Sequence, residues 1–225
     1  SMVSVPLMAS AATPPGTALS LMELVNDGAF GRAWNAYNQT VDSSGPTIEG
    51  RPSPVVYGAT VHVYSRAGNG DLIEFVNDGL WGRLWNAYDL TRAANGPTLA
   101  GDPGAVRYSG TDIHIYTEAP NGDLIEFVND GLWGRLWNAY DLTRATNGPA
   151  LGGDPTPLLV GTAVETFTRT SSGDLAEITN NGVNGRLWNA YDLTQQSGGP
   201  TISGDPQAVQ YGASTHVYAE GSNGD

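Results

Sequence analysis

One segment of 25 residues occurs twice without a change, at 69–93 and again at 121–145. The tetrad Trp-Asn-Ala-Tyr extends the repetition to four copies, 51 or 52 residues apart, which begin at Trp34, Trp85, Trp137 and Trp188. Self-similarity at a fixed period of this length is typical of repeat architectures, in which each repeat is one supersecondary unit. We therefore expect one repeat domain over residues 17–225, preceded by a lead over residues 1–16 that is either disordered or an extra strand.

Each repeat contains short segments in which apolar and polar residues alternate. VHVY, IHIY and THVY, at 61–64, 113–116 and 215–218, have the pattern of a half-buried strand. A Gly-Asp turn that suits a tight hairpin follows each of them, and LIEFV and RLWNAYDL predict two further strands. With a fourth strand from the segment before the His strand, the sequence predicts an all-β fold without substantial helix. Each repeat of about 51 residues would be one four-stranded blade of a β-propeller.

The two ends of the sequence predict complementary halves of one further blade. Residues 223–225 stand at the turn after which earlier repeats continue into LIEFV, and residues 21–27 resemble that continuation. We expect the termini to share one blade, because this arrangement removes exposed strand edges. Two closures fit this expectation: a closed four-bladed ring of one chain, or an exchanged eight-bladed dimer of two chains.

Composition and motifs exclude several classes of function. The net charge of -13 repels phosphate backbones, so nucleic acid is not expected as a partner. All ten basic residues are Arg and Cys is absent, which excludes lysine and thiolate chemistry. No apolar run approaches the roughly 20 residues of a membrane span. The sequence has no nucleophile elbow or phosphate loop, and no carboxylate pair is unique to one repeat, so we do not expect an enzyme. A propeller glycosidase, which needs a distinctive acid and nucleophile, is the less favoured alternative.

One column of the repeat raises the question of a metal. It contains His62, His114, Glu165 and His216. The second strands of propeller blades lie well off the axis, too far apart for these side chains to share one ion at about 2 Å. We therefore expect no metal and no cofactor.

The turn NDGLWG differs from ordinary turns because it carries large apolar residues. Its aromatic column reads Phe30, Trp81, Trp133 and Asn184. A core position rarely accepts Trp to Asn, whereas a ligand platform can lose its aromatic in one copy. The alternative is a turn that packs on the next blade. The tetrad tryptophans, by contrast, are expected to fill the space between blades, and the tetrad Asn and Tyr are expected to be structural.

Polar columns beside the turn add further candidates. Arg83 and Arg135 offer planar forks that suit paired acceptors, although a cross-strand ion pair with the repeated Glu is the favoured interpretation. Asp102 and Asp154 lie in Gly-Asp-Pro segments at the entry of a blade. Such an Asp usually closes a turn, and it could also accept hydrogen bonds from two hydroxyls of a sugar.

The pattern NGDLIEFVNDG…GRLWNAYDLT…GP…GDP…YG…HVY resembles the repeats of the PLL-type bacterial β-propeller lectins and, more loosely, the tachylectins. The resemblance covers about residues 17–225. It implies a propeller that binds fucose or O-methylated sugars in shallow pockets between blades, and it carries over the aromatic of the turn at Trp81 and Trp133. Because related rings have more than four blades, the exchanged dimer is favoured.

The predicted function is a carbohydrate-binding lectin with repeated sugar sites and multivalent recognition of glycans. The alternative is a structural or protein-interaction propeller, in which all the aromatic columns are core. The location is left open, with secretion or the cell surface favoured.

Overall fold

The computed structural model describes residues 19–108 and 112–224, so the predicted lead over residues 1–16 and Asp225 lie outside the described residues. The described chain consists of antiparallel strands joined by tight turns, with four one-turn α-helices and four 3-10 turns. This arrangement confirms the predicted all-β fold built from repeated four-stranded antiparallel sheets.

Three complete sheets, called blades below, are flanked by two half-blades. The first blade contains β3 (Ile48–Tyr57), β4 (Thr60–Ala67), β5 (Leu72–Val76) and β6 (Asn86–Asp89). The second contains β7 (Gly104–Arg107), β8 (Ile113–Glu118), β9 (Leu124–Val128) and β10 (Asn138–Asp141). The third contains β11 (Thr156–Val160), β12 (Ala163–Arg169), β13 (Leu175–Thr179) and β14 (Asn189–Asp192). The N-terminal half-blade is β1 (Met22–Val25) with β2 (Asn35–Asn38), and the C-terminal half-blade is β15 (Gln207–Tyr211) with β16 (Ser214–Tyr218).

A short helix follows the last strand of each complete blade and of the N-terminal half-blade. These helices are α1 (Gln39–Asp42), α2 (Leu90–Ala94), α3 (Leu142–Thr146) and α4 (Leu193–Ser197). They replace the end of the predicted RLWNAYDL strand. The reason is a helix cap: the Asp89 carboxylate accepts a hydrogen bond from the Arg92 backbone N–H at 2.8 Å, which satisfies a free donor at the helix start.

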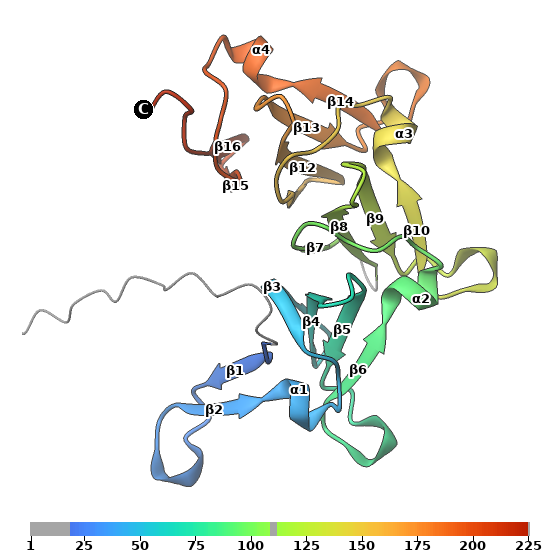
Figure 1. The fold of residues 1–225 in the computed structure, drawn as a ribbon, viewed down its shortest axis with the longest axis vertical. Helices are drawn as coiled ribbons and strands as arrows, with labels where there is room; N and C mark the ends of the chain where they lie inside the picture. Colours follow the sequence, from blue (N-terminus) through green and yellow to red (C-terminus); the bar gives the residue numbers. More distant parts are fainter. Residues whose placement is uncertain (1–18, 109–111, 225) are drawn as a thin grey trace, which may run out of the picture.

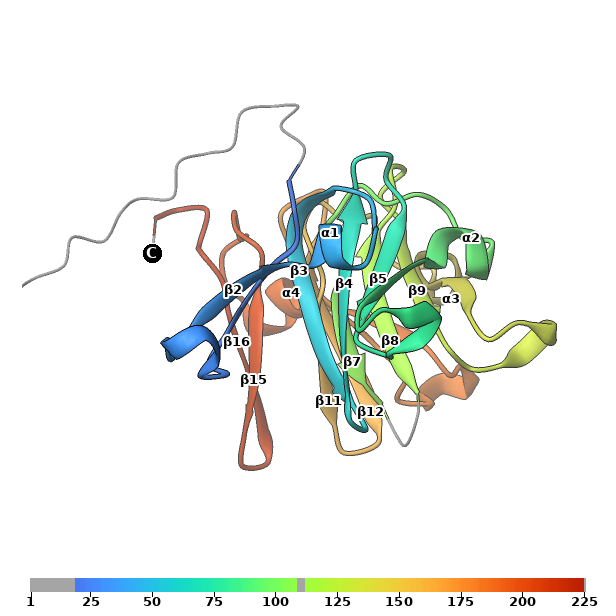
Figure 2. The same cartoon turned by 90° about the horizontal axis from the view of Figure 1, so that it is seen from below.

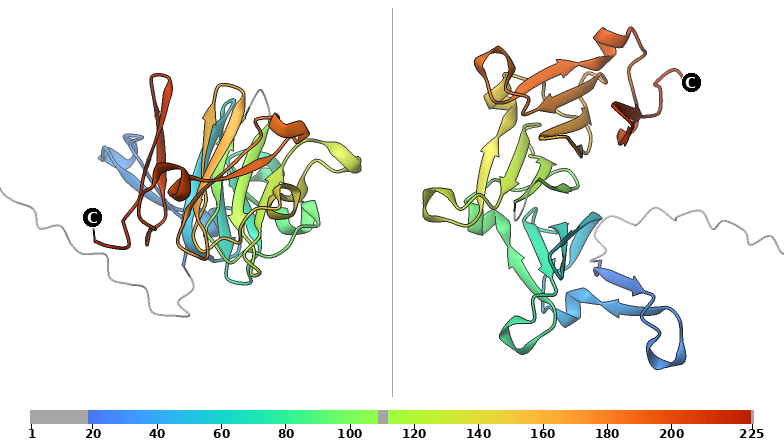
Figure 3. Two further views of the ribbon diagram at one scale, coloured as in Figure 1. Left: turned by 90° about the horizontal axis from the view of Figure 1, so that it is seen from above. Right: turned by 180° about the vertical axis from the view of Figure 1, so that it is seen from behind.

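The blades follow one another along an open arc (Figure 1). The first strands of successive units, β3, β7, β11 and β15, contact one another and form its inner side. Seen from below, the strands of the blades stand side by side with similar directions (Figure 2). The view from behind shows the two half-blades at opposite ends of the arc (Figure 3).

The apolar core lies between the blades. The cluster between the first and second blades joins Tyr64 and Leu72 to Phe127 and Trp137. Trp85 and Trp137 are only 6% and 7% exposed, which confirms that these tetrad tryptophans fill the space between blades. Trp34 is 62% exposed, and here the core prediction is wrong for the single chain, because no blade of the described residues covers Trp34.

The predicted shared blade does not form within one chain. In the described residues, β1 pairs with β2 and β15 pairs with β16, as two separate two-stranded sheets. The described residues therefore do not form the closed four-bladed ring within one chain. Exchange of half-blades between two chains stays a prediction.

Candidate functional site

The NDGLWG turn displays its aromatic side chain to solvent. Trp81, Trp133 and Phe30 are 82%, 81% and 78% exposed. Each has a positive φ, between 51° and 55°, which bulky residues rarely adopt. These exposures overturn the alternative in which the turn packs on the next blade. The side chain of Asn184, the fourth member of the column, lies outside the described residues.

A cluster of hydrogen bonds holds each turn in this shape. The Asn86 amide donates to the Asp78 carboxylate at 2.6 Å and to the Leu80 carbonyl at 3.0 Å, and the Tyr88 hydroxyl donates to Asp78 at 2.7 Å. Burial opposes ionisation of Asp78, but the hydrogen bonds from Leu80, Tyr88 and Asn86 outweigh it and lower the pKa of the carboxyl. The predicted structural role of the tetrad Asn and Tyr is therefore confirmed. The same contacts recur at Asp27, Asn35 and Tyr37, and at Asp130, Asn138 and Tyr140.

Three equivalent pockets lie where each blade meets the unit before it. The first is lined by 44–47, 67–69, Asp71, Ile73 and 87–89. The second has Asn95, Gly96, Pro97, Asn121, Asp123 and Tyr140 at corresponding positions, and the third has Asn147, Gly148, Pro149, Ser172, Asp174 and Tyr191. Their volumes are about 660, 260 and 260 Å³. The two smaller ones fall just below the roughly 300–1,000 Å³ typical of pockets for drug-sized ligands, a size that suits a small polar ligand.

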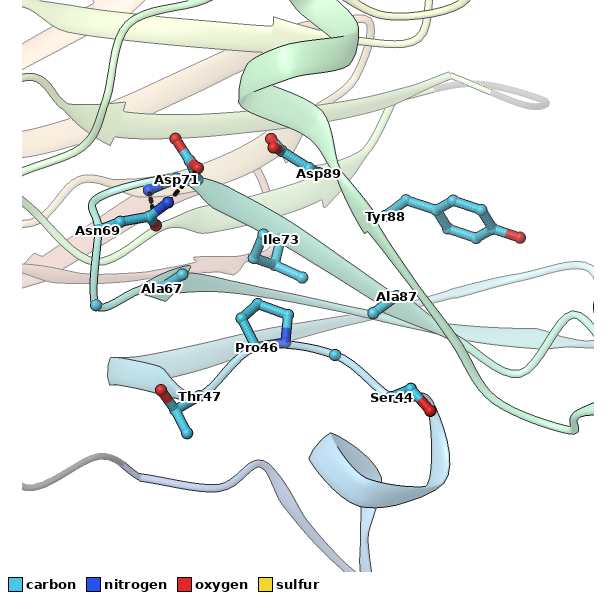
Figure 4. A pocket seen from close by; sticks show the side chains of 12 residues that line it. Ser44, Pro46, Thr47, Ala67, Asn69, Asp71, Ile73, Ala87, Tyr88 and Asp89 are labelled. Carbon is cyan, nitrogen blue, oxygen red and sulfur yellow. Dashed lines mark hydrogen bonds between the residues drawn. The ribbon is translucent and has the colours of Figure 1, made fainter.

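The first pocket combines an apolar floor with a polar end (Figure 4). Pro46, Ile73 and Ala87 lie on the floor, while the carboxylates of Asp71 and Asp89 are at the same end of the pocket. The Asn69 amide donates to one oxygen of Asp71. In the third pocket the Ser172 hydroxyl makes the same contact with Asp174, at 2.6 Å. Ionised carboxylates accept hydrogen bonds only, so this end of each pocket favours a ligand with several hydroxyl donors.

Tyr88 links the aromatic turn to this pocket, because its hydroxyl donates to Asp78 of the turn. Tyr88 lines the pocket, and its pKa is raised by burial and by its hydrogen bond to Asp78, whereas a hydrogen bond with the Trp81 side chain lowers it. Arg83 donates to the Ser43 carbonyl at 3.1 Å, next to a lining residue of the pocket. Arg135 and Arg186 donate in the same way to Ala94 and Thr146, at 3.4 and 3.5 Å. Each predicted arginine therefore ties its turn to the helix end of the preceding unit.

The predicted ion pair between the repeated Glu and Arg is wrong. Glu74 instead accepts a hydrogen bond from the Tyr64 hydroxyl at 3.0 Å and lies 2.7 Å from Nδ1 of His62. Burial, followed by the charge of Glu74, raises the pKa of Tyr64. The second blade has the same triad of His114, Glu126 and Tyr116.

The third blade lacks this triad because Glu165 and Phe167 replace His and Tyr. Glu177 there faces a second carboxylate instead of an imidazole. Burial, reinforced by the charge of Glu165, raises the pKa of Glu177 to about 7. Thr215 of the C-terminal half-blade donates to Glu165 at 3.0 Å. Among the described residues, no group of three or more His, Cys, Asp or Glu side chains is placed to hold a metal ion.

Asp102 and Asp154 connect successive blades. Asp102 accepts a hydrogen bond from the Arg51 backbone N–H at 2.8 Å, and Asp154 accepts one from the Asp102 N–H at 2.7 Å. Asp205 continues the series by accepting from the Asp154 N–H at 3.0 Å. Neither Asp102 nor Asp154 lines the three pockets. These contacts favour the structural interpretation, and sugar binding by the two residues stays a prediction.

The sequence reasoning found the aromatic turn and its arginines but missed the polar end of the pocket. The sequence pattern predicts only a turn at Asn69 and Asp71 and a strand at Asp89. A usable signal was present, because Asp71 and Asp89 recur in register in each complete repeat.

Several solved structures share this fold. A mutant of AofleA from Arthrobotrys oligospora is 20% identical, with a TM-score of 0.52 over 84% of this chain and 56% of that one. A complex of Aleuria aurantia lectin with α-methyl-L-fucoside is 16% identical, with a TM-score of 0.54 over 90% of this chain and 63% of that one. Another structure of that lectin, described as a six-bladed β-propeller, is 17% identical, with a TM-score of 0.51 over 91% and 64%.

These likenesses show a β-propeller type of fold, and the chain spans less than two thirds of the length of the proteins in these three structures. The matched structures do not single out the PLL-type family among propeller lectins. No protein-family model and no curated protein matches the chain. In the described residues, no helix is long and apolar enough to cross a membrane.

Proposed function

We propose that this chain is a lectin that binds small sugars in the pockets between its blades. The observation that carries the proposal is the repetition of one pocket three times, each with an apolar floor and a carboxylate end. An enzyme needs one asymmetric site, whereas repeated equivalent sites suit a multivalent binder of clustered glycans.

The chemistry of the pocket suits a deoxy or methylated sugar. Sugar hydroxyls donate to the carboxylates of Asp71 and Asp89, while a methyl group rests on the apolar floor formed by Ile73 and Ala87. The aromatic turn offers a separate stacking surface: the exposed Trp81 presents a flat face to the C–H groups of a sugar. Aleuria aurantia lectin and SapL1 have been solved with α-methyl fucosides, so fucosides are the first ligands to test.

The affinity of each site depends on the aromatic side chain of its turn. Trp81 and Trp133 make the strongest sites, Phe30 a weaker one, and Asn184 contributes little stacking, because stacking area falls in that order. Arg83 and Arg135 hold the turns against the preceding helix and keep donors free for ring or hydroxyl oxygens. Asp102 and Asp154 are the weakest candidates, since their carboxylates already accept backbone hydrogen bonds.

A glycan array followed by calorimetry with α-methyl fucoside tests the proposal. We expect retention of fucosylated or methylated glycans and millimolar to micromolar single-site affinity, with stronger binding to clustered ligands. The matched variant is the triple substitution Asp71→Asn, Asp123→Asn and Asp174→Asn, which keeps the size of the side chains, removes one of the two carboxylates from each pocket and should weaken binding. An array with no retained glycan would refute the lectin proposal and favour a protein-interaction propeller, whose docking surface would be the exposed Leu84 and Leu136 beside the turns.

A further inference from the structure

The two half-blades expose residues whose counterparts are buried in the complete blades. Tyr64 and Tyr116 are 0% exposed, but the equivalent Tyr218 on β16 is 64% exposed. In the N-terminal half-blade Trp34 is 62% exposed, against 6% for Trp85. In the complete blades a neighbouring strand or blade covers the equivalent side chains, whereas Tyr218 and Trp34 are left exposed.

The missing strands are complementary. In each complete blade the second strand pairs with the third, as β4 pairs with β5. In the described residues β16 is a second strand without a third, and β1 is a third strand without a second. The register of β4 on β5, transferred to β16 and β1, places Tyr218 opposite Glu23 and Val217 opposite Leu24. Unpaired edges of this kind invite another strand.

The polar groups are complementary as well. In the first blade Glu74 lies against His62 and Tyr64. At the corresponding positions Glu23 stands in the N-terminal half-blade, and His216 and Tyr218 stand in the C-terminal half-blade. Within the described chain, Glu23 accepts a hydrogen bond from Gln39, and the His216 ring contacts Tyr211 and Tyr218. Pairing of β16 with β1 would therefore assemble one more His–Glu–Tyr triad.

The fourth pocket is divided in the same way. Ser197, Gly199, Pro200 and Gly221 line a cavity beside the C-terminal half-blade, at positions equivalent to lining residues of the third pocket. The opposite wall, equivalent to Ala190, Tyr191 and Asp192, is provided by Ala36, Tyr37 and Asn38 of the N-terminal half-blade. The described residues of one chain contain both walls of this pocket, but the two walls lie apart, one in each half-blade.

We infer that a second copy of residues 1–225 pairs its β1 with β16, reciprocally, so that two such segments close one ring with two composite blades. Each composite blade joins Glu23 of one chain to His216 and Tyr218 of the other and completes the fourth pocket. The half-blades lie at opposite ends of the arc, which favours a partner chain over the same chain (Figures 1 and 3). A two-fold pair satisfies both edges at once. Only the use of this pocket for sugar rests on the proposed function.

The mass of residues 1–225 in solution is the first test and needs no variant or sugar. Light scattering after size exclusion should give twice the 23.6 kDa of one chain. A monomer, or a series of larger open assemblies, would overturn the inference. A dimer that binds no glycan would refute the proposed function alone, and a glycan-binding monomer would refute the exchange alone.

A cysteine pair tests the register. The chain has no cysteine, so Leu24→Cys with Val217→Cys, equivalent to the opposed pair Phe75 and Val63, introduces the only thiols. Mild oxidation should give a dimer band on a non-reducing gel. The control Val25→Cys with Val217→Cys is one residue out of register and points its thiols to opposite faces, so it should remain unlinked. A disulfide formed at monomer mass would mean that one chain closes on itself. Equal linking of both variants would mean that the two strands have no defined register. Either result contradicts the exchange.

Discussion

The indole of Trp137 lies edge-on against the phenol ring of Tyr64, with ring centroids 6.2 Å apart and planes at 67°, although the two residues belong to neighbouring blades. Trp188 and Tyr116 repeat this contact at the next junction, at 6.1 Å and 66°. Because each Tyr hydroxyl also donates to a buried Glu, one side chain joins the polar triad of its own blade to the apolar seam with the next. This Trp–Tyr packing therefore requires two neighbouring units.

Trp137→Ala should destabilise the fold strongly. Removing a buried tryptophan from a packed seam costs about 3–5 kcal/mol of unfolding free energy, since the transfer term and the cavity term add. Urea titration followed by circular dichroism measures this loss. Trp81→Ala is the matched control, because Trp81 is exposed and should change stability by about 0.5 kcal/mol or less. Equal losses for both variants would mean that the turn is part of the core.

Trp81→Ala combined with Trp133→Ala should weaken fucoside binding several-fold and leave the fold intact. The two indoles supply the stacking surface of the strongest proposed sites, and neither is buried. Calorimetry with α-methyl fucoside gives the affinity, and a thermal melt of the same sample checks the fold. Wild-type affinity in the double variant would confine the sugar to the pocket floor and its carboxylates.

Asp102→Ala should lower stability by about 1–3 kcal/mol without changing sugar affinity. The substitution removes a charged acceptor from the Arg51 backbone N–H at the junction between blades. Melting temperature and fucoside affinity are measured on the same variant. Asp42→Ala, at an exposed position of α1, provides a comparison for the loss of one negative charge. A selective loss of affinity would instead support the sugar-binding prediction for Asp102.

The repeat length, strand order and hairpin turns could be predicted because they depend on local patterns: period-two alternation and Asn-Gly or Gly-Asp turns. The inter-blade position of Trp85 followed from the same regularity. The partners of Glu74 and Arg83 could not be predicted from one repeat. Glu74 contacts the preceding strand of its own blade, whereas Arg83 contacts the preceding unit. The pocket was missed for a related reason. Its floor and its polar end come from three segments of two units, and a single repeat read alone shows only turn residues.

Glu177→Gln should stabilise the protein more at pH 8 than at pH 5. Burial and the charge of Glu165 raise the pKa of Glu177 from 4.5 to about 7, so the folded chain binds a proton that the unfolded chain releases between these values. Stability from this group is therefore fully present below about pH 4.5 and is lost as the pH rises through about 7. Glutamine keeps the neutral form at every pH and removes this slope.

Melting temperatures of the wild type and Glu177→Gln across pH 5 to 8 measure the difference. Glu165→Gln is the control, because it removes the neighbouring charge but leaves Glu177 buried, so its effect should be in the same direction and smaller. Parallel curves for the wild type and Glu177→Gln would mean that Glu177 is ionised across the whole range. In that case the third blade would need a further hydrogen-bond partner for its two facing carboxylates, at the position that the imidazoles of His62 and His114 occupy in the first two blades.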